Sequence, residues 1–202
     1  MTGTVHLIDT GVANVASLIA ALERLGRTPV LTRDPAVADA PEPLVLPGVG
    51  AFGAGMARLV ETGLAGPLAA RIARGAPTLA VCLGLQLLCE SSEETPGVVG
   101  LGAVTGHVVR FPATVRVPQF GWNRVTPAAP GGLLEAGYAY FANSYCLREA
   151  PAGWAVARAD HAGPFVAALE RGAVLACQFH PELSSAYGAG LLGRWLERAV
   201  TC

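Results

Sequence analysis

Two short stretches of this sequence contain residues whose types could carry out catalysis, and the first is built around a cysteine. Cys82 ends the apolar run 78–81 and stands directly before a helical pattern that starts at Leu83. A nucleophile at a strand-to-helix turn needs small neighbours, which Ala80 and Gly84 provide. The N-terminus of a following helix favours the thiolate form. The position predicts a nucleophilic cysteine, with a buried structural cysteine as the alternative.

The second stretch, His180-Pro181-Glu182, offers a base for that thiol. In an extended segment, residues two apart share a face, so His180 and Glu182 can point together while Pro181 fixes the backbone between them. The carboxylate would orient the imidazole and stabilise its charged form. A surface turn is one alternative. A metal site of Cys177 and His180 is another, disfavoured because three positions along a strand place side chains on opposite faces. The remaining histidines lack ligand spacing: His6, His107 and His161.

The elements that must position these residues follow an alternating pattern. Strand-like runs and helical patterns alternate through the first half, which predicts an α/β fold with a mostly parallel central sheet and helices on both faces. Val-rich pieces broken by glycine and proline, from about 98 to 125, predict an antiparallel β extension. A last helix is expected at about 184–200. The expected strands are 5–8, 30–31, 44–46, 78–81, 138–147, 154–157, 165–169 and 174–179, and the expected helices are 12–25, 56–73 and 83–89.

Composition narrows the function classes. With 202 residues, 52% of them hydrophobic, we expect a single domain spanning 1–202. The formal net charge of −1 and the lack of a Lys/Arg block argue against nucleic acid or a membrane surface as partner. No apolar run reaches the ~18 residues of a membrane helix. Five cysteines, without CxxC spacing, fit a reducing compartment, so we expect a cytoplasmic protein.

A glycine-rich stretch, Gly48 to Gly53, raises a different possibility. It matches G-x-G-x-x-G after an apolar run, as in a dinucleotide-binding turn of an oxidoreductase. That function needs an acidic residue near the end of the next strand to bind a ribose. The next strand ends in Cys82 instead, and Pro47 separates the strand from the first glycine. We therefore expect these glycines to serve another anion.

Two motifs, in order along the chain, carry a family resemblance. Residues 80–86 match G-x-C-x-G-x-Q, with Ala80 in place of the first glycine, and residues 180–182 read H-P-E. The chain resembles a class I (triad-type) glutamine amidotransferase, which implies a flavodoxin-like fold. Within that class it resembles the glutaminase subunits of imidazole glycerol phosphate synthases. That narrower resemblance rests on four segments: residues 9–14, 47–52, 121–123 and 143–145.

The resemblance implies a reaction and assigns roles in it. Cys82 attacks the side-chain amide of L-glutamine, His180 transfers the proton and Glu182 orients His180. Ammonia leaves, and water hydrolyses the glutamyl thioester without a cofactor or a metal. The residues that hold the glutamine would be Gln86, Glu94, Ser144 and Tyr145.

The resemblance also implies an oxyanion hole. The backbone N–H of Leu83 supplies one donor, and the glycines around Val49 and Gly50 allow a peptide there to turn a second N–H inward. In this family, that segment is thought to reorient only when the partner is loaded with its nucleotide.

A partner subunit follows from the same resemblance. Ammonia would pass through a tunnel to a (β/α)8-barrel cyclase subunit in a heterodimer. There it would join a phosphoribulosyl formimino aminoimidazole carboxamide ribonucleotide, giving imidazole glycerol phosphate and aminoimidazole carboxamide ribonucleotide in histidine biosynthesis. Asn14, Trp122 and Asn123 match the docking side. A turn stabilised by the packing of Trp122 is the alternative.

Some residues depart from the family's pattern. Gln119 and Phe120 replace the usual histidine and methionine, and Leu183 stands where a basic residue is common after H-P-E. These positions lie where partner contact is expected, so an interfacial ion pair of the relatives would be missing.

Two rival functions stay within the same fold. The first is a glutaminase subunit of another synthase, such as one for pyridoxal phosphate, but the G-E-S usual there is absent from this sequence. The second is a non-catalytic subunit that keeps the fold. The intact Cys82, His180 and Glu182 argue against it.

Overall fold

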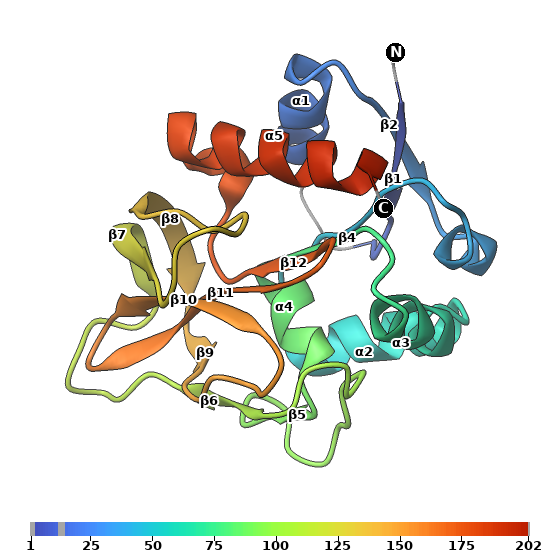
Figure 1. Ribbon diagram of the computed structural model, residues 1–202. Coiled ribbons are helices and arrows are strands. Elements are labelled where there is room, and N and C mark those ends of the chain that lie inside the picture. The colour runs from blue at the N-terminus through green and yellow to red at the C-terminus, as the bar shows by residue number, and fades with distance from the viewer. Residues whose placement is uncertain (1–2, 12–14, 202) are drawn as a thin grey trace.

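The chain is built around a large twisted β-sheet. In the computed structural model, which describes residues 3–11 and 15–201, nine strands form one sheet in the order β2-β1-β3-β4-β12-β11-β10-β7-β8 (Figure 1). Five neighbours pair in parallel: β2 (Thr28–Thr32), β1 (Thr4–Ile8), β3 (Leu44–Leu46), β4 (Thr78–Val81) and β12 (Val174–Cys177). The rest pair antiparallel: β11 (Pro164–Arg171), β10 (Ala155–Asp160), β7 (Gln119–Pro127) and β8 (Gly137–Asn143). This confirms the predicted α/β class with an antiparallel extension.

Helices cover both faces of the parallel part, as Figure 1 shows. One face carries α1 (Ala16–Arg24) and α5 (Ser185–Thr201), and the other carries α2 (Phe52–Glu61), α3 (Ala65–Ala73) and α4 (Leu83–Leu88). Two short 3-10 helices, η1 (Pro35–Ala38) and η2 (Pro181–Leu183), complete the helical elements of the described residues. None of the helices within those residues is long and apolar enough to cross a membrane.

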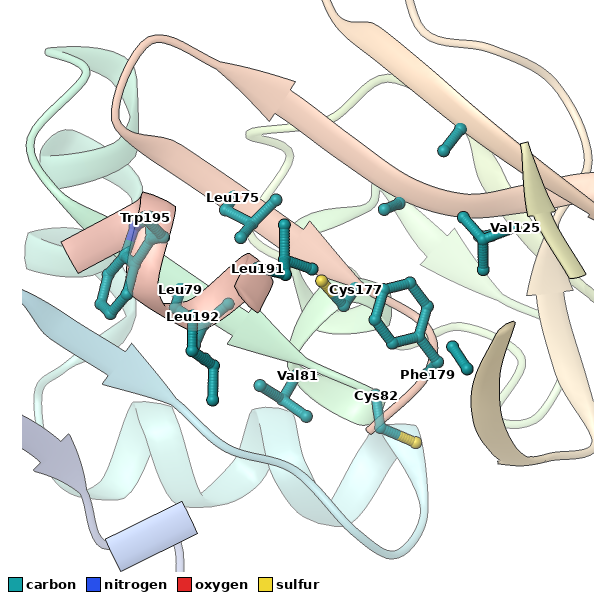
Figure 2. Packing of buried hydrophobic residues seen from close by; sticks show 14 of the residues in the cluster. Leu79, Val81, Cys82, Val125, Leu175, Cys177, Phe179, Leu191, Leu192 and Trp195 are labelled. Atoms are coloured by element: carbon teal, nitrogen blue, oxygen red, sulfur yellow. The ribbon is translucent and has the colours of Figure 1, made fainter. Parts of the chain in front are cut away.

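The alternation of side chains along β4 divides the core into two layers. Leu79 and Val81 belong to the cluster under α1 and α5, whereas Ala80 belongs to the cluster on the opposite face. Figure 2 shows the first cluster, in which Leu191 and Trp195 of α5 pack against the sheet. Trp195 also donates its indole N–H to the carbonyl of Ala173 at 3.0 Å. The carboxyl end of β4 is therefore packed on both faces of the sheet, which fixes the position of Cys82, the next residue.

Three local features differ from the sequence-based expectation. The pattern read as one helix over 56–73 is two helices, because α2 starts at Phe52 and the chain turns at Gly63, whose φ is +71°. The run 138–147 divides at Ser144 into β8 and β9 (Tyr145–Leu147). A separate three-stranded sheet then joins β9 to β6 (His107–Arg110) and β5 (Ser91–Ser92). The expected helix over 12–25 begins at Ala16 in the described part of the chain.

A fully buried arginine ties the η1 loop to the sheet. The Arg71 guanidinium donates to the carbonyls of Ala38, Ala40, Glu42 and Pro77 at 2.7–3.1 Å. Burial lowers the pKa of Arg71 to about 10, which leaves the guanidinium charged at neutral pH. Because all of these acceptors are neutral carbonyls, Arg71 has a structural role and holds this loop against the sheet.

Candidate active site

Cys82 lies at the turn between β4 and α4, as its spacing predicted. Its backbone has φ 53° and ψ −108°, a conformation that residues with a side chain rarely adopt. The Cys82 N–H donates to the carbonyl of Cys177 at 2.7 Å, which fixes the turn against β12. In Figure 2 the sulfur of Cys82 points away from Leu191 and Trp195. The turn therefore places the thiol at the carboxyl end of β4, in a residue that is 8% exposed.

Close backbone contacts explain the small residues around the turn. A Cβ at position 84 would lie 2.3 Å from the carbonyl oxygen of Leu46, so only glycine fits. A Cβ at position 48 would lie 2.6 Å from the backbone nitrogen of Gly84. Ala80, in contrast, is accommodated within β4, opposite Leu46 and Ala176 in the ladder. The substitution of the first motif glycine leaves the strand pairing intact.

The His180–Glu182 pair forms, although its backbone differs from the expected extended segment. β12 ends at Cys177, and Pro181 starts the 3-10 helix η2, which brings Glu182 back beside the ring. His180 Nδ1 lies 2.9 Å from Glu182 Oε1, and both side chains are largely buried. The backbone N–H of His180 donates to the carbonyl of Tyr140 at 2.9 Å, which ties the backbone at His180 to β8.

The charge of His180 is set by its two neighbours. Burial by itself lowers the pKa of His180, but hydrogen bonds and charges from Cys82 and Glu182 outweigh burial and raise this pKa to about 10. An imidazolium between a thiolate and a carboxylate is the arrangement of an activated cysteine nucleophile. The site is therefore suited to nucleophilic attack and proton return.

Cys177, the other thiol near this histidine, does not join the site. It belongs to the core cluster under α5, where burial raises its pKa well above the usual range (Figure 2). In the described part of the chain, no three His, Cys, Asp or Glu side chains gather as metal ligands would. The histidines without ligand spacing have other places: His6 lies in β1, His107 contacts Ser91 Oγ, and His161 contacts the Arg116 carbonyl.

A cavity of about 210 Å³ lies in front of Cys82 and is large enough for a small polar substrate. It gathers segments from both halves of the chain: the turn after β3, the start of α4, the loop after β5, and the β8–β9 junction. Its lining residues are Val49, Gly50, Cys82, Leu83, Gln86, Glu94, Ala142, Asn143, Ser144, Tyr145 and His180. Every residue predicted to bind glutamine or to form the oxyanion hole is among them.

Two residues near the nucleophile were not singled out from the sequence. Gln178 accepts from Gln86 Nε2 at 3.0 Å, and its own Nε2 lies 3.8 Å from Cys82 Sγ. Asn143 donates to the carbonyl of Tyr145, which also accepts from Gln86. Gln178 stands two residues before His180, and Asn143 is the first residue of the segment 143–145. Their positions in or beside these motifs could have indicated that they lie near the nucleophile.

Glu94 reaches the cavity and also caps a helix. Its Oε2 accepts the N–H of Phe52, the first residue of α2, at 2.6 Å. The carboxylate can use its second oxygen for a cationic group in the cavity, because an ionised carboxylate accepts several hydrogen bonds. Gln86 differs, since its amide nitrogen is engaged by the protein and its oxygen is left for a ligand.

The predicted oxyanion donors Val49, Gly50 and Leu83 line the cavity, and the N–H of Leu83 is already bound within the protein. The N–H of Leu83 donates to the carbonyl of Gly48 at 3.3 Å. This carbonyl competes for the N–H that an oxyanion on the substrate would use. An oxyanion hole at this position would require the Gly48–Val49 peptide to turn, and Gly50, with φ +102°, provides backbone freedom beside it.

The residues predicted to lie at the partner interface have different environments in the structure. Trp122 is 55% exposed and lies edge-on to Tyr140, whereas Asn123, its neighbour along β7, faces the other way and donates to the Asp160 carbonyl at 2.8 Å. Asn14 lies outside the described residues. Two further large side chains on the Trp122 face of β7 and β8 are exposed: Phe120 and Tyr138. We call Phe120, Trp122 and Tyr138 the aromatic patch. Leu183, in η2, is also exposed.

Known proteins are similar to this chain over most of its length. The family model for glutamine amidotransferase class-I matches residues 6–194. Imidazole glycerol phosphate synthase subunit HisH from Methanothermobacter thermautotrophicus is 40% identical over 196 residues, covering 96% of this chain and 98% of the relative. The protein of the same name from Yersinia pseudotuberculosis is 37% identical over 198 residues, covering 96% and 98%.

Solved structures extend the likeness to the fold. A crystal structure of a glutamine amidotransferase superposes with a TM-score of 0.77 at 22% identity, covering 98% of this chain and all of that chain. A chain in the structure of PurLQS from Thermotoga maritima gives a TM-score of 0.72 at 15% identity, covering 99% of this chain and 100% of that chain. At these identities, the likeness concerns the fold alone.

Proposed function

This chain belongs to the class-I glutamine amidotransferases, and from that premise we propose that it is the glutaminase subunit of an imidazole glycerol phosphate synthase, acting in histidine biosynthesis. It hydrolyses L-glutamine to glutamate and supplies the ammonia to a cyclase subunit. The observation that carries this proposal is the thiol of Cys82, held at a strained strand-to-helix turn beside the paired His180 and Glu182.

The first half of the reaction forms a thioester. The Cys82 thiolate attacks the side-chain amide carbon of glutamine, and the carbonyl oxygen becomes an oxyanion. The imidazolium of His180 gives its proton to the departing nitrogen, the carbon–nitrogen bond breaks, and ammonia leaves. Glu182 holds the ring through Nδ1 at 2.9 Å, which directs the other ring nitrogen toward the reacting atoms.

The second half regenerates the enzyme. His180, now neutral, takes a proton from water as the water attacks the thioester carbon. Glutamate leaves with the new oxygen, and Cys82 returns as the thiolate beside the imidazolium. The substrate is held by Gln86, Glu94, Ser144 and Tyr145, whose polar groups suit the amide, the α-ammonium and the α-carboxylate.

Oxyanion stabilisation requires a change of backbone. The N–H of Leu83 and the N–H of Val49 or Gly50 form the hole once the Gly48 carbonyl has turned away from Leu83. Removing one such donor typically costs ~2.7–4 kcal/mol in activation free energy. While the Leu83 N–H is bound to the Gly48 carbonyl, the chain therefore hydrolyses glutamine slowly. Hydrolysis becomes fast when the cyclase subunit has bound its nucleotide.

The partner is a (β/α)8-barrel cyclase subunit in a cytoplasmic heterodimer, and the whole chain 1–202 acts as one domain within it. The aromatic patch supplies the docking surface, since exposed aromatic side chains are typical anchors of interfaces. Leu183 stands where a basic residue is common in relatives, and Gln119 stands where a histidine is usual. Apolar contact thus takes the place of the expected ion pair.

The test compares glutamine hydrolysis by the chain alone, by the chain with the cyclase subunit, and by the complex with the cyclase nucleotide. We expect ammonia release to be low in the first and highest in the last, and Cys82→Ala to abolish it. Ammonia release that survives Cys82→Ala would overturn the catalytic assignment. Equal rates with and without the partner would overturn the gating.

A further inference from the structure

The start of α2 is held by residues far away in sequence. Its N-cap position is Ala51, which has no side chain to accept a hydrogen bond. The first two helical N–H groups are instead satisfied by Phe52 donating to Glu94 Oε2 at 2.6 Å and Gly53 donating to Thr95 Oγ1 at 3.1 Å. Helices need such acceptors, because their first N–H groups have no partner within the helix. The loop after β5 therefore determines where α2 begins.

The contact is closely packed. A Cβ at position 53 would lie 2.6 Å from Thr95 Cγ2 and 3.0 Å from Thr95 Oγ1. Phe52, the first residue of the helix, is fully buried. The last glycine of the G-x-G-x-x-G stretch thus makes room for a threonine rather than for a nucleotide.

The same helix start is one end of the oxyanion segment, which we define as residues 47–51. At its other end, Leu46 is fixed in β3, where it pairs with Ala80 of β4. Between these ends, the Gly48 carbonyl accepts from Leu83, and this peptide must turn for catalysis. A peptide can turn reproducibly only if both ends of the segment stay in place. The hold on Phe52 and Gly53 supplies the second fixed end.

We propose that Glu94 and Thr95 are positioning residues for the oxyanion segment, and that Glu94 couples this role to the presence of glutamine. The inference rests on the proposed glutaminase function. Glu94 lines the cavity and caps Phe52 with one oxygen. When its other oxygen binds the α-ammonium of glutamine, the carboxylate is fixed from both sides. Substrate binding therefore secures the end of the segment that must turn.

Thr95 allows the positioning role to be tested apart from binding, because it does not line the cavity. Thr95→Val keeps the shape and removes the acceptor for Gly53, whereas Thr95→Ser keeps the hydroxyl. A matched control is Thr62→Val at the other end of α2, where the hydroxyl donates to the Arg58 carbonyl at 2.8 Å. All three are measured in the complex with the nucleotide-loaded cyclase subunit, by glutamine kinetics and thermal unfolding.

For Thr95→Val we expect kcat to fall by about five- to tenfold, the effect of losing one capping bond, while KM for glutamine changes less than about twofold. Thr95→Ser should restore kcat, and Thr62→Val should lower the unfolding temperature without lowering kcat. An unchanged kcat in Thr95→Val, or an equal loss in Thr62→Val, would overturn the positioning role. A wild-type complex that releases no ammonia from glutamine would instead refute the proposed function.

The coupling through Glu94 has its own readout. In the Cys82→Ala complex, which binds glutamine without consuming it, hydrogen exchange at the amides of Phe52 and Gly53 should slow when glutamine is added. Glu94→Gln should remove this protection while the exchange of α5 stays the same. Identical exchange with and without glutamine in the Glu94 protein would refute the coupling.

Discussion

Gly84→Ala tests whether the turn around Cys82 depends on one backbone contact. The new Cβ would lie 2.3 Å from the Leu46 carbonyl oxygen, against 3.4 Å or more for an ordinary contact, so the two backbones must separate by about 1 Å. Leu46 cannot yield easily, because it is fixed in the ladder with Ala80. Overpacking of this kind costs about 1–3 kcal/mol in the free energy of unfolding. At about 2–4 °C per kcal/mol for a chain of this size, the unfolding temperature should fall by several degrees.

Activity should suffer more than stability. A displacement of about 1 Å at the reacting groups typically lowers the rate by about 10²-fold. The assay is glutamine hydrolysis in the loaded complex, together with thermal unfolding. Gly193→Ala in α5 is the control, because a Cβ there meets nothing within 4 Å and alanine favours helices by about 0.5–1 kcal/mol over glycine. A Gly84→Ala protein with wild-type kcat and unfolding temperature would refute the reasoning.

Three further changes follow from features described above. Arg71→Met keeps the volume but removes the guanidinium hydrogen bonds to four buried or half-buried carbonyls, so denaturant unfolding should show a loss of about 3 kcal/mol or more in the free energy of unfolding; a loss below about 1 kcal/mol would contradict the structural role of Arg71. The pKa of His180 is raised from 6.5 to about 10, so its pairing stabilises the fold fully below pH 6.5 and this contribution disappears as pH rises through about 10. Glu182→Gln should flatten that alkaline decline in stability and move the alkaline limit of activity to lower pH, and identical pH profiles would count against it. Trp122→Ala should weaken cyclase binding by about 2 kcal/mol, or about 30-fold in Kd by titration, whereas the exposed Val60→Ala should leave Kd unchanged; equal affinities for the two variants would exclude the aromatic patch from the interface.

The sequence predicted the positions of candidate catalytic residues where these positions depend on neighbours along the chain. The apolar run before Cys82 and the helical pattern after it were enough to place the thiol at a strand-to-helix turn, and the spacing of His180 and Glu182 was enough to pair them. The backbone conformation that brings the two side chains together was not predicted. It is the 3-10 helix η2, which is held by hydrogen bonds from Ser184 to the carbonyls of His180 and Pro181, whereas the sequence indicated an extended segment.

Several contacts between residues distant in sequence could not be predicted. Glu94 and Phe52 stand 42 positions apart, and nothing in either segment alone indicates that one caps the other. The same holds for Gln178 beside Gln86, and for the Gly48 carbonyl on the Leu83 N–H. The split of the run 138–147 depends on β9 finding β6 in a second sheet, which a hydrophobic pattern does not specify.

The position of β12 has a consequence for the nascent chain. This strand is the last of the described strands along the sequence, yet it lies in the middle of the large sheet, between β4 and β11. Until it inserts, the two halves of the sheet have no common strand, and Cys82 lacks both the carbonyl of Cys177 and the imidazole that follows that strand. A ribosome-bound chain therefore carries a thiol without its base. The site for glutamine hydrolysis can form only after the segment 174–182 has been synthesised and β12 has inserted between its two neighbours.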